Sequence, residues 1–171
     1  MLLHTNSAGD NPAMAHGRAN EGNARDWYCK KYGKEVFELS LCVPLWDPRI
    51  GGSPDGLVWE PNCPLGPAGM IEIKCPSPDK GMYNSLKELP EEWYVPPEGD
   101  YSHIKWEHYD QMQGCMAILN RTWCDYIVYS TGDSTQHVER IPFNPKYWWQ
   151  ELYPSLCRFM DDLQFHKYLL R

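Results

Sequence analysis

Residues 51–76 read GGSPDGLVWEPNCPLGPAGMIEIKCP and hold two short apolar segments joined by a turn-prone connection. In a strand over residues 69–75, successive side chains point to opposite faces. We expect the face that carries Ile71 and Ile73 to be the core face. The other face carries Glu72 and Lys74, and charged groups are costly to bury. The sequence therefore predicts that this second face opens onto a cleft.

Asp55 precedes the connection, and Glu72 follows it. If residues 50–59 and 69–75 form adjacent antiparallel strands, the turn brings Asp55 beside Glu72. Carboxylate oxygens are the ligands that Mg²⁺ or Mn²⁺ prefers, and the backbone carbonyl of Ile73 would complete the set. Lys74 would then orient or help deprotonate a metal-bound water, or offset negative charge in the transition state. Two acids, a lysine and a metal predict the hydrolysis of phosphodiesters.

Each part of this pattern also has an ordinary structural explanation. A Glu-x-Lys sequence on an edge strand is often a solvated face, and Pro-Asp-Gly is a routine turn. Glu21 could form an exposed i,i+4 pair with Arg25 on a helix. Gln111 and Gln113 could likewise be ordinary solvent-facing helix formers. It is the combination of acids and lysine, in this order around a turn, that favours a site.

A second group of possible metal ligands is His103, Glu107 and His108, which follow one another at helical spacing. Only His103 and Glu107 share a face at i,i+4. We interpret this group as a surface patch rather than as a metal site.

Length and composition indicate a packed globular protein. The chain has 171 residues, of which 42% are hydrophobic and 13% aromatic, and its net charge is −7. We expect one domain over residues 1–171. The acidity disfavours a protein that coats duplex DNA non-specifically, although basic groups that line one channel would still attract phosphates.

The compartment is predicted from what the sequence lacks. It contains no run of about 18 apolar residues and no basic start followed by an apolar block, so we expect neither a membrane span nor secretion. Seven cysteines are scattered singly without a C-x-x-C pair. We therefore expect reduced thiols in an intracellular protein, in the cytoplasm or nucleus of a host cell, and no iron–sulfur cluster or zinc ribbon.

The order of elements predicts an α/β (α+β) fold with a central mixed sheet of about five strands flanked by helices. The core covers about residues 11–144, and an extended flap covers about residues 77–100, with a short helix near residues 82–88. A last helix spans about residues 145–169. The elements expected in the core are a helix over 11–32, strands over 35–46, 50–59 and 69–75, a helix over 102–119, and two strands over 123–131 and 135–143.

Four blocks of the sequence resemble a known nuclease family. They are HGRANEGNARDWY at 16–28, SPDGL at 53–57, IEIKCP at 71–76 and YDQMQGCM at 109–116. The pair PD…EIK resembles the PD-(D/E)XK nuclease superfamily. The four blocks in this order resemble, more narrowly, the lambda-exonuclease or YqaJ-like viral recombinase type. The resemblance covers roughly residues 16–120 and implies a nuclease-like core and a viral or phage origin.

The resemblance also implies roles for individual residues. Asp55, Glu72 and the Ile73 carbonyl would hold the metal, and Lys74 would be the catalytic lysine. Glu21 would be a ligand of a second metal ion, and Gln111 would be a glutamine that faces the active site. Ser53, Gln113 and Arg25 would contact phosphate or DNA.

The activity implied is a Mg²⁺-dependent exonuclease that resects double-stranded DNA ends from the 5′ end, for recombination or repair. Some family members form ring-shaped trimers and work beside a single-strand annealing protein. One departure concerns the N-terminal helices that bring an arginine to the family's 5′-phosphate pocket, since only 15 residues, none of them Arg, precede His16. End preference therefore stays open. Two other functions also stay open. One is an endonuclease or an RNA-cleaving relative with the same site, and the other is an inactive DNA-binding module.

Overall fold

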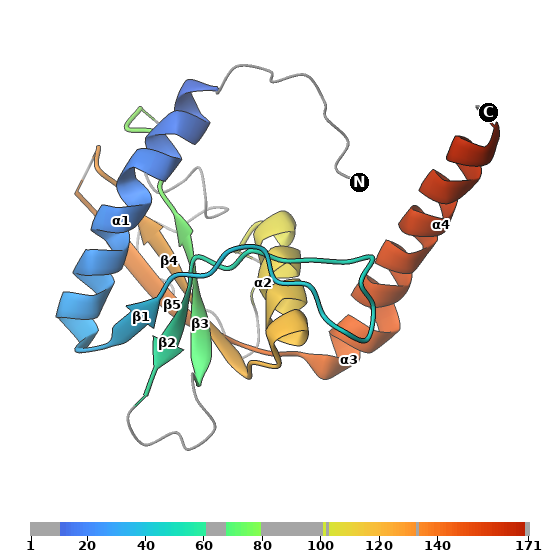
Figure 1. The fold of residues 1–171 in the computed structure, drawn as a ribbon. Helices are drawn as coiled ribbons and strands as arrows, with labels where there is room; N and C mark the ends of the chain where they lie inside the picture. The colour runs from blue at the N-terminus through green and yellow to red at the C-terminus, as the bar shows by residue number, and fades with distance from the viewer. Residues whose placement is uncertain (1–10, 61–67, 80–100, 102, 133, 170–171) are drawn as a thin grey trace.

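The computed structural model describes residues 11–60, 68–79, 101, 103–132 and 134–169, with side chains to residue 163. Most of the expected flap over residues 77–100, including its short helix, lies outside this part of the chain. The described elements form one five-stranded sheet with helices against it (Figure 1). The predicted fold class is confirmed.

The sheet has the strand order β1-β2-β3-β4-β5. Its strands are β1 (Glu35–Phe37), β2 (Gly56–Trp59), β3 (Gly69–Lys74), β4 (Trp123–Tyr129) and β5 (Gln136–Pro142). β3 and β4 are parallel, and the other neighbours are antiparallel. The parallel pair requires a crossover, which includes helix α2 (Trp106–Leu119). The sheet is therefore mixed, as predicted.

Helix α1 (Pro12–Tyr32) has the bounds that its end signals predict. The Asn11 side chain accepts a hydrogen bond from the Ala13 N–H at 3.0 Å, and Pro12 occupies the first turn, where its missing N–H is harmless. Gly33 ends the helix with a left-handed backbone, φ 61° and ψ 34°. Glycine adopts this conformation without steric penalty, so the chain can turn directly into β1.

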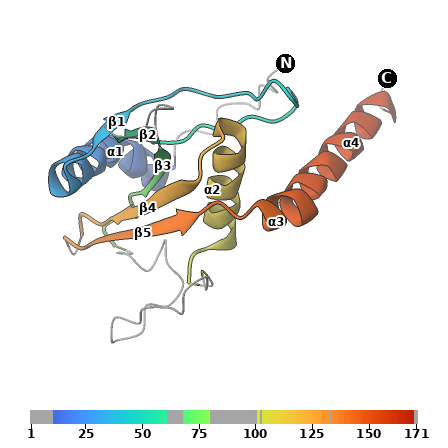
Figure 2. The ribbon, with the colours of Figure 1, turned by 90° about the horizontal axis from the view of Figure 1, so that it is seen from below.

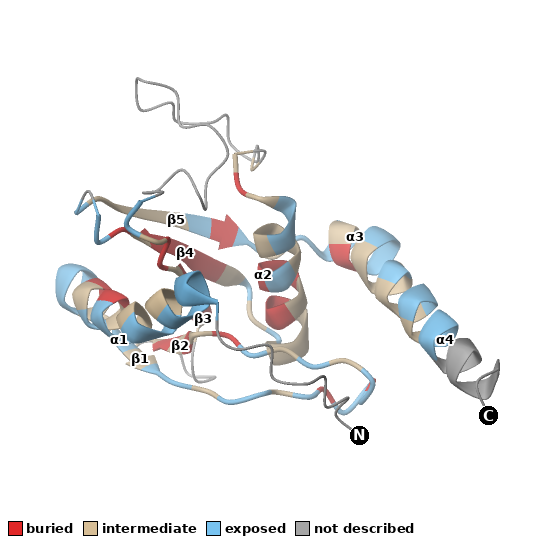
Figure 3. Ribbon diagram, turned by 90° about the horizontal axis from the view of Figure 1, so that it is seen from above, coloured by how far each residue is buried: buried red, intermediate tan, exposed pale blue. Residues whose placement is uncertain are grey.

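Helices α1 and α2 cover opposite faces of the sheet (Figures 1 and 2). On one face, Ala24 and Tyr28 of α1 pack against Ile71 and Ile73. On the other face, buried residues of α2 pack against Met70 and its neighbours on β4, so both faces of β3 are buried (Figure 3). The prediction of a single core face was therefore incomplete, because the second helix shelters the Glu72 side of the strand as well.

Two predicted strands are shorter in the structure. The strand expected over 35–46 ends at Phe37, and the one expected over 50–59 begins at Gly56. Between them the chain forms a long loop that carries one isolated bridge, Cys42↔Gly52. Pro44 and Pro48 cannot donate to a ladder. A run of β-forming residues therefore stays outside the sheet.

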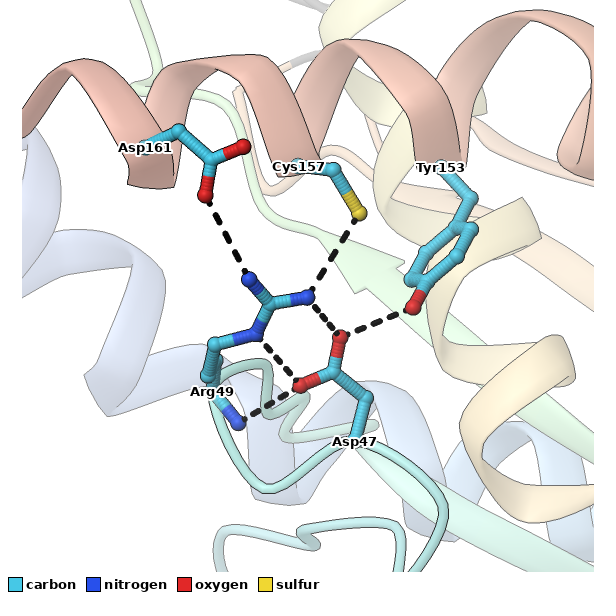
Figure 4. Close-up of polar contacts among 5 residues, drawn as sticks. All are labelled: Asp47, Arg49, Tyr153, Cys157 and Asp161. Atoms are coloured by element: carbon cyan, nitrogen blue, oxygen red, sulfur yellow. Dashed lines mark hydrogen bonds and ion pairs between the residues drawn. The ribbon is translucent and has the colours of Figure 1, made fainter.

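The C-terminal helix is divided into α3 (Pro145–Tyr147), the π-helical η2 (Trp148–Leu152) and α4 (Tyr153–Leu169), and α4 extends away from the sheet (Figure 1). Asp47 in the long loop ties the two regions together (Figure 4). It accepts hydrogen bonds from Arg49 Nε at 2.9 Å, Arg49 Nη2 at 2.8 Å and Tyr153 Oη at 2.8 Å. These partners hold the pKa of Asp47 well below its usual range. Arg49 also reaches Cys157 and Asp161, so the loop is fastened to the start of α4.

Among the described helices, none combines the length and the apolar composition needed to cross a bilayer.

Candidate active site

Asp55 and Glu72 meet at the end of β2, as the turn between the two strands predicts. The register pairs Gly56 with Ile71, so the next positions along the strands, 55 and 72, are opposite each other. Asp55 Oδ2 accepts a hydrogen bond from the Ile73 N–H at 2.6 Å. The carboxylate of Asp55 is thereby anchored to the backbone of the strand that carries Glu72 and Lys74.

Pro54 leaves the carbonyl oxygen of Ile73 without a backbone donor at the same point. A ladder continued for two more positions would pair residue 54 with Ile73, but proline has no N–H to donate. The Ile73 N–H points toward β2, and the N–H and C=O of a strand residue face the same neighbour. The Ile73 carbonyl therefore faces the end of β2, next to Asp55. Gly56 keeps this corner compact, because an added Cβ would collide with the Val36 side chain on β1.

Glu72 is the most deeply buried acid of the site, with 1% of its side chain exposed. Its Oε1 accepts a hydrogen bond from Lys74 Nζ at 2.6 Å, and Lys74 Nζ also donates to Gln111 Oε1 at 3.1 Å. The second oxygen, Glu72 Oε2, is buried and has no hydrogen-bond partner among the described residues. A buried carboxylate oxygen without a donor is unusual and calls for a cation or a proton.

The protonation of both acids follows from this environment. Burial raises the pKa of Glu72 to about 7, and the nearby Asp55 adds to the rise, whereas Lys74 opposes it. Burial also raises the pKa of Asp55, although the Ile73 N–H and Lys74 act in the other direction. Acids whose pKa is raised in this way cluster at functional sites, since the protein holds negative charges closer together than water would.

Glu21 of α1 reaches the same place from the other side of β3. Together with Ile73, Lys74 and Cys75 it lines a cleft of about 370 Å³. Its charge contributes to the raised pKa of both Asp55 and Glu72. The structure therefore brings Glu21 to the acid cluster. The alternative, an ion pair between Glu21 and Arg25, is not what the structure shows, because Arg25 forms its ion pair with Glu38.

Two basic residues of the cleft were missed by the sequence interpretation: Arg18 and Lys105. His108, which the sequence interpretation grouped with His103 and Glu107 as a surface patch, lines the cleft as well. Arg18 lies three positions before Glu21 on α1, and this spacing places both on one helical face. Lys105 and His108 flank the start of α2. Only the helical spacing of Arg18 offered a signal, because the approach of α2 to the end of β3 is a long-range contact.

The remaining candidates are spread around this cluster. Gln111 is exposed and bonded to Lys74, but Gln113 is completely buried. The Gln113 side chain donates to the Pro142 carbonyl at 3.0 Å and accepts from the Asn144 N–H at 2.8 Å. It thus holds the start of the C-terminal helix and is not available in the cleft, so the structure does not support its predicted DNA contact. Ser53 is exposed on the loop two positions before Asp55.

The group of His103, Glu107 and His108 is also arranged differently from what helical spacing predicts. α2 begins at Trp106, so His103 precedes the helix and does not share a helical face with Glu107. His103 bonds instead to Glu139 on β5, and His108 contacts the Tyr126 hydroxyl.

Comparison with solved structures finds the same architecture in an alkaline exonuclease, LHK-Exo, from Laribacter hongkongensis. One crystal structure is similar with a TM-score of 0.69 and 28% identity, over 95% of this chain and 75% of the exonuclease chain. Another, with dAMP bound, is similar with a TM-score of 0.72 and 30% identity, over 94% and 73%. A search among curated proteins found no match. The family model for the YqaJ-like viral recombinase domain matches residues 1–132. The chain belongs to the YqaJ-like viral recombinase family, as its four sequence blocks indicated.

Proposed function

We propose that this protein is a metal-dependent exonuclease that hydrolyses phosphodiester bonds at the ends of linear duplex DNA, in the 5′-to-3′ direction. The observation that carries the proposal is the convergence of Asp55, Glu72 and Lys74 at the end of β2, with a buried carboxylate oxygen that lacks a donor. Membership of the YqaJ-like family and the likeness to an alkaline exonuclease support the same class of activity.

The donor set fits a divalent ion such as Mg²⁺ or Mn²⁺. Hard oxygens are available from Asp55, from Glu72 Oε2 and from the Ile73 carbonyl. Glu21 lies on the cleft that Ile73 and Lys74 line, and its charge acts on both acids. Burial is the main cause of the raised pKa of Glu72, and the negative charges of Asp55 and Glu21, which a bound cation would offset, add to it. We assign the first ion to Asp55, Glu72 and the Ile73 carbonyl, and a second ion to the side where Glu21 lies. A bound ion would polarise the scissile phosphate and favour ionisation of the attacking water.

The residues of the chain have distinct tasks in this proposal. Lys74, held between Glu72 and Gln111, presents its ammonium to the cleft, where it would orient the nucleophile and offset charge that develops on the phosphate. Arg18 and Lys105 supply positive charge along the same cleft, so phosphates would be attracted locally although the whole chain carries a net charge of −7. Arg25, whose charge acts on Asp55, and Ser53, which is exposed two positions before Asp55, are candidate phosphate contacts.

The test is the degradation of end-labelled linear duplex DNA in Mg²⁺, with wild type and Asp55→Asn compared. Asp55→Asn keeps the shape of the side chain but removes the charge, so the fold should persist and nucleotide release should fall by roughly 1000-fold, about 4 kcal/mol of transition-state stabilisation. Asp26→Asn, an exposed acid on α1, is the matched control. Label release from the 5′ end before the 3′ end is the expected polarity.

Other substrates separate the rival activities. Cleavage of covalently closed circular DNA would identify an endonuclease, and preferential cleavage of structured RNA would identify an RNA-cleaving relative. DNA binding in Ca²⁺ without turnover in Mg²⁺ or Mn²⁺ would identify an inactive binding module. Asp55→Asn with wild-type activity in a nuclease-free preparation would overturn the site assignment.

A further inference from the structure

A second cluster of side chains with metal-ligating groups lies beyond β4 on the same face of the sheet as Glu72. His137 and Glu139 are two positions apart on β5, so they share the face of the sheet that α2 covers. His103 approaches them from the segment that precedes α2. Tyr126 of β4 is paired with Glu72 on one side and with Glu139 on the other. The cluster is therefore two strands, about 10 Å, from the Glu72 position.

The ligand atoms of this cluster already converge. Glu139 Oε2 lies 2.6 Å from His103 Nε2 and 3.2 Å from His137 Nε2. One ligand atom from each of the three side chains lies within 4.8 Å of the other two. In a tetrahedral zinc site with bonds of about 2.0–2.1 Å, ligand atoms are separated by roughly 3.3 Å. Small side-chain movements would therefore let one ion contact all three atoms.

The surroundings of the cluster suit a bound cation. The three side chains are between 14% and 19% exposed, so they are sheltered but can still be reached from solvent. The Glu139 carboxylate lies within hydrogen-bonding distance of both imidazole rings, so the acid and the two rings are already gathered around one point.

We propose that His103, His137 and Glu139 form a binding site for a transition-metal ion, Zn²⁺ foremost. Two imidazoles and one carboxylate select borderline ions of this kind, whereas Mg²⁺ prefers an all-oxygen set such as the one at Asp55 and Glu72. Three protein ligands leave the fourth position to water. Bound metal would fasten the segment before α2 to strand β5.

The experiment uses the full chain, stripped with a chelator and kept in excess Mg²⁺ so that the oxygen ligands of the acidic cleft are occupied. Titration with Zn²⁺ in this Mg²⁺ buffer should show one equivalent of Zn²⁺ bound and an increase in the melting temperature. Titration with Co²⁺ should give the visible absorption of a four-coordinate ion with nitrogen ligands. His103→Gln and His137→Gln should each weaken Zn²⁺ binding at least 100-fold. His16→Gln, on α1, is the matched control and should bind like wild type.

Several outcomes would overturn the proposal. Wild type that binds no Zn²⁺ in the presence of Mg²⁺, or shows only octahedral Co²⁺ absorption, excludes the site whatever the variants do. Folded variants that bind Zn²⁺ like wild type exclude these ligands. If a histidine variant does not fold, Glu139→Gln keeps the size of the side chain and removes its charge, and unchanged binding by that variant also contradicts the assignment. Loss of DNA degradation in Asp55→Asn has no bearing on any of these readouts.

Discussion

Glu72 and Asp125 are both buried carboxylates on neighbouring strands, with 1% and 5% of each residue exposed, but their surroundings differ. Asp125 lies on the α1 side of the sheet, and both of its oxygens are satisfied. Its Oδ1 accepts from Arg140 Nε at 2.8 Å, and its Oδ2 accepts from Arg140 Nη2 at 2.9 Å and Tyr28 Oη at 2.6 Å. Glu72 lies on the α2 side with one oxygen bonded to Lys74 and the other without a partner among the described residues.

The difference distinguishes a structural acid, Asp125, from the acid that we propose to be functional, Glu72. A buried charge that is fully paired stabilises one arrangement of the chain and is strongly destabilising to remove only because its partners are then left unpaired. A buried charge that is partly unpaired makes the folded state less stable unless a ligand completes it. The Asp125 network joins α1 to the sheet, whereas the Glu72 site remains able to accept a cation. The comparison therefore predicts that mutation of Glu72 lowers activity but not the free energy of unfolding, and that mutation of Asp125 does the reverse.

The largest effect is expected at Glu72. Glu72→Gln removes the charge that would hold the metal, so degradation of linear duplex DNA should fall by roughly 1000-fold, about 4 kcal/mol. The free energy of unfolding without metal should not decrease, because an unpaired buried charge has been removed. Nuclease assays and urea unfolding check the two parts. Glu35→Gln on β1 is the exposed control. Activity within tenfold of wild type would remove Glu72 from the site.

Asp125→Ala should produce the opposite pattern. It leaves the Tyr28 hydroxyl and the Arg140 guanidinium without their acceptor, and we expect a loss of about 3 kcal/mol in the free energy of unfolding. Activity per folded molecule should stay close to wild type. Urea unfolding and nuclease assays at a temperature where the variant is folded measure both quantities. Tyr28→Phe removes one hydrogen bond only and should cost about 1 kcal/mol. A stable but inactive Asp125→Ala would break the distinction between the two acids.

The pH dependence of stability sharpens the same comparison. The folded pKa of Glu72 is raised to about 7 from its ordinary 4.5, so the folded state binds the proton more tightly. Its contribution to stability is fully present below about pH 4.5 and is lost as the pH rises through about 7. In chelator, wild type should therefore lose on the order of 2–3 kcal/mol relative to Glu72→Gln over this range. Thermal unfolding at several pH values measures this difference. Equal pH profiles for the two proteins would contradict it, and Mg²⁺ should reduce the loss at high pH.

The smallest effect is expected at Gln111, which contacts the site only through Lys74. Gln111→Ala removes the acceptor 3.1 Å from Lys74 Nζ and should lower the turnover rate about tenfold, or 1.4 kcal/mol, because the ammonium is held less firmly. Its side chain is exposed, so the free energy of unfolding should change by less than about 0.5 kcal/mol. Gln150→Ala, another exposed glutamine, is the control. An unchanged turnover rate would show that Glu72 alone positions Lys74.

Local signals predicted the elements that hold the acids. The alternation of MIEIKC placed Glu72 and Lys74 on one face of a strand, and Asn11, Pro12 and Gly33 marked the ends of α1. These features depend on residues within a few positions of one another, and the backbone obeys them wherever the segment lies. The position of Asp55 beside Glu72 was predicted from the direct connection between two neighbouring antiparallel strands, and the register that sets it comes from the packing of their buried faces.

Contacts between distant segments could not be predicted in the same way. Pro44 argues against a strand that continues through residues 43–46, but nothing within residues 35–46 places its end at Phe37. Nothing in the loop itself indicates that Asp47 reaches Tyr153. Gln111 and Gln113 are alike in sequence terms. They differ only because the packing of α2 turns one outward to Lys74 and buries the other against the start of the C-terminal helix.

The sequence by itself determined the family, the strand order around the acids and the residues that share a face, since each follows from local spacing or from a motif. Only the tertiary structure decided that Glu72 is buried with an unsatisfied oxygen, that Glu21 and Lys105 face the same cleft, and that His103 meets Glu139 on the face of the sheet that α2 covers. The reason is physical. Burial and electrostatic coupling depend on how α1 and α2 pack onto the two faces of the sheet, and no short segment of the chain contains that information.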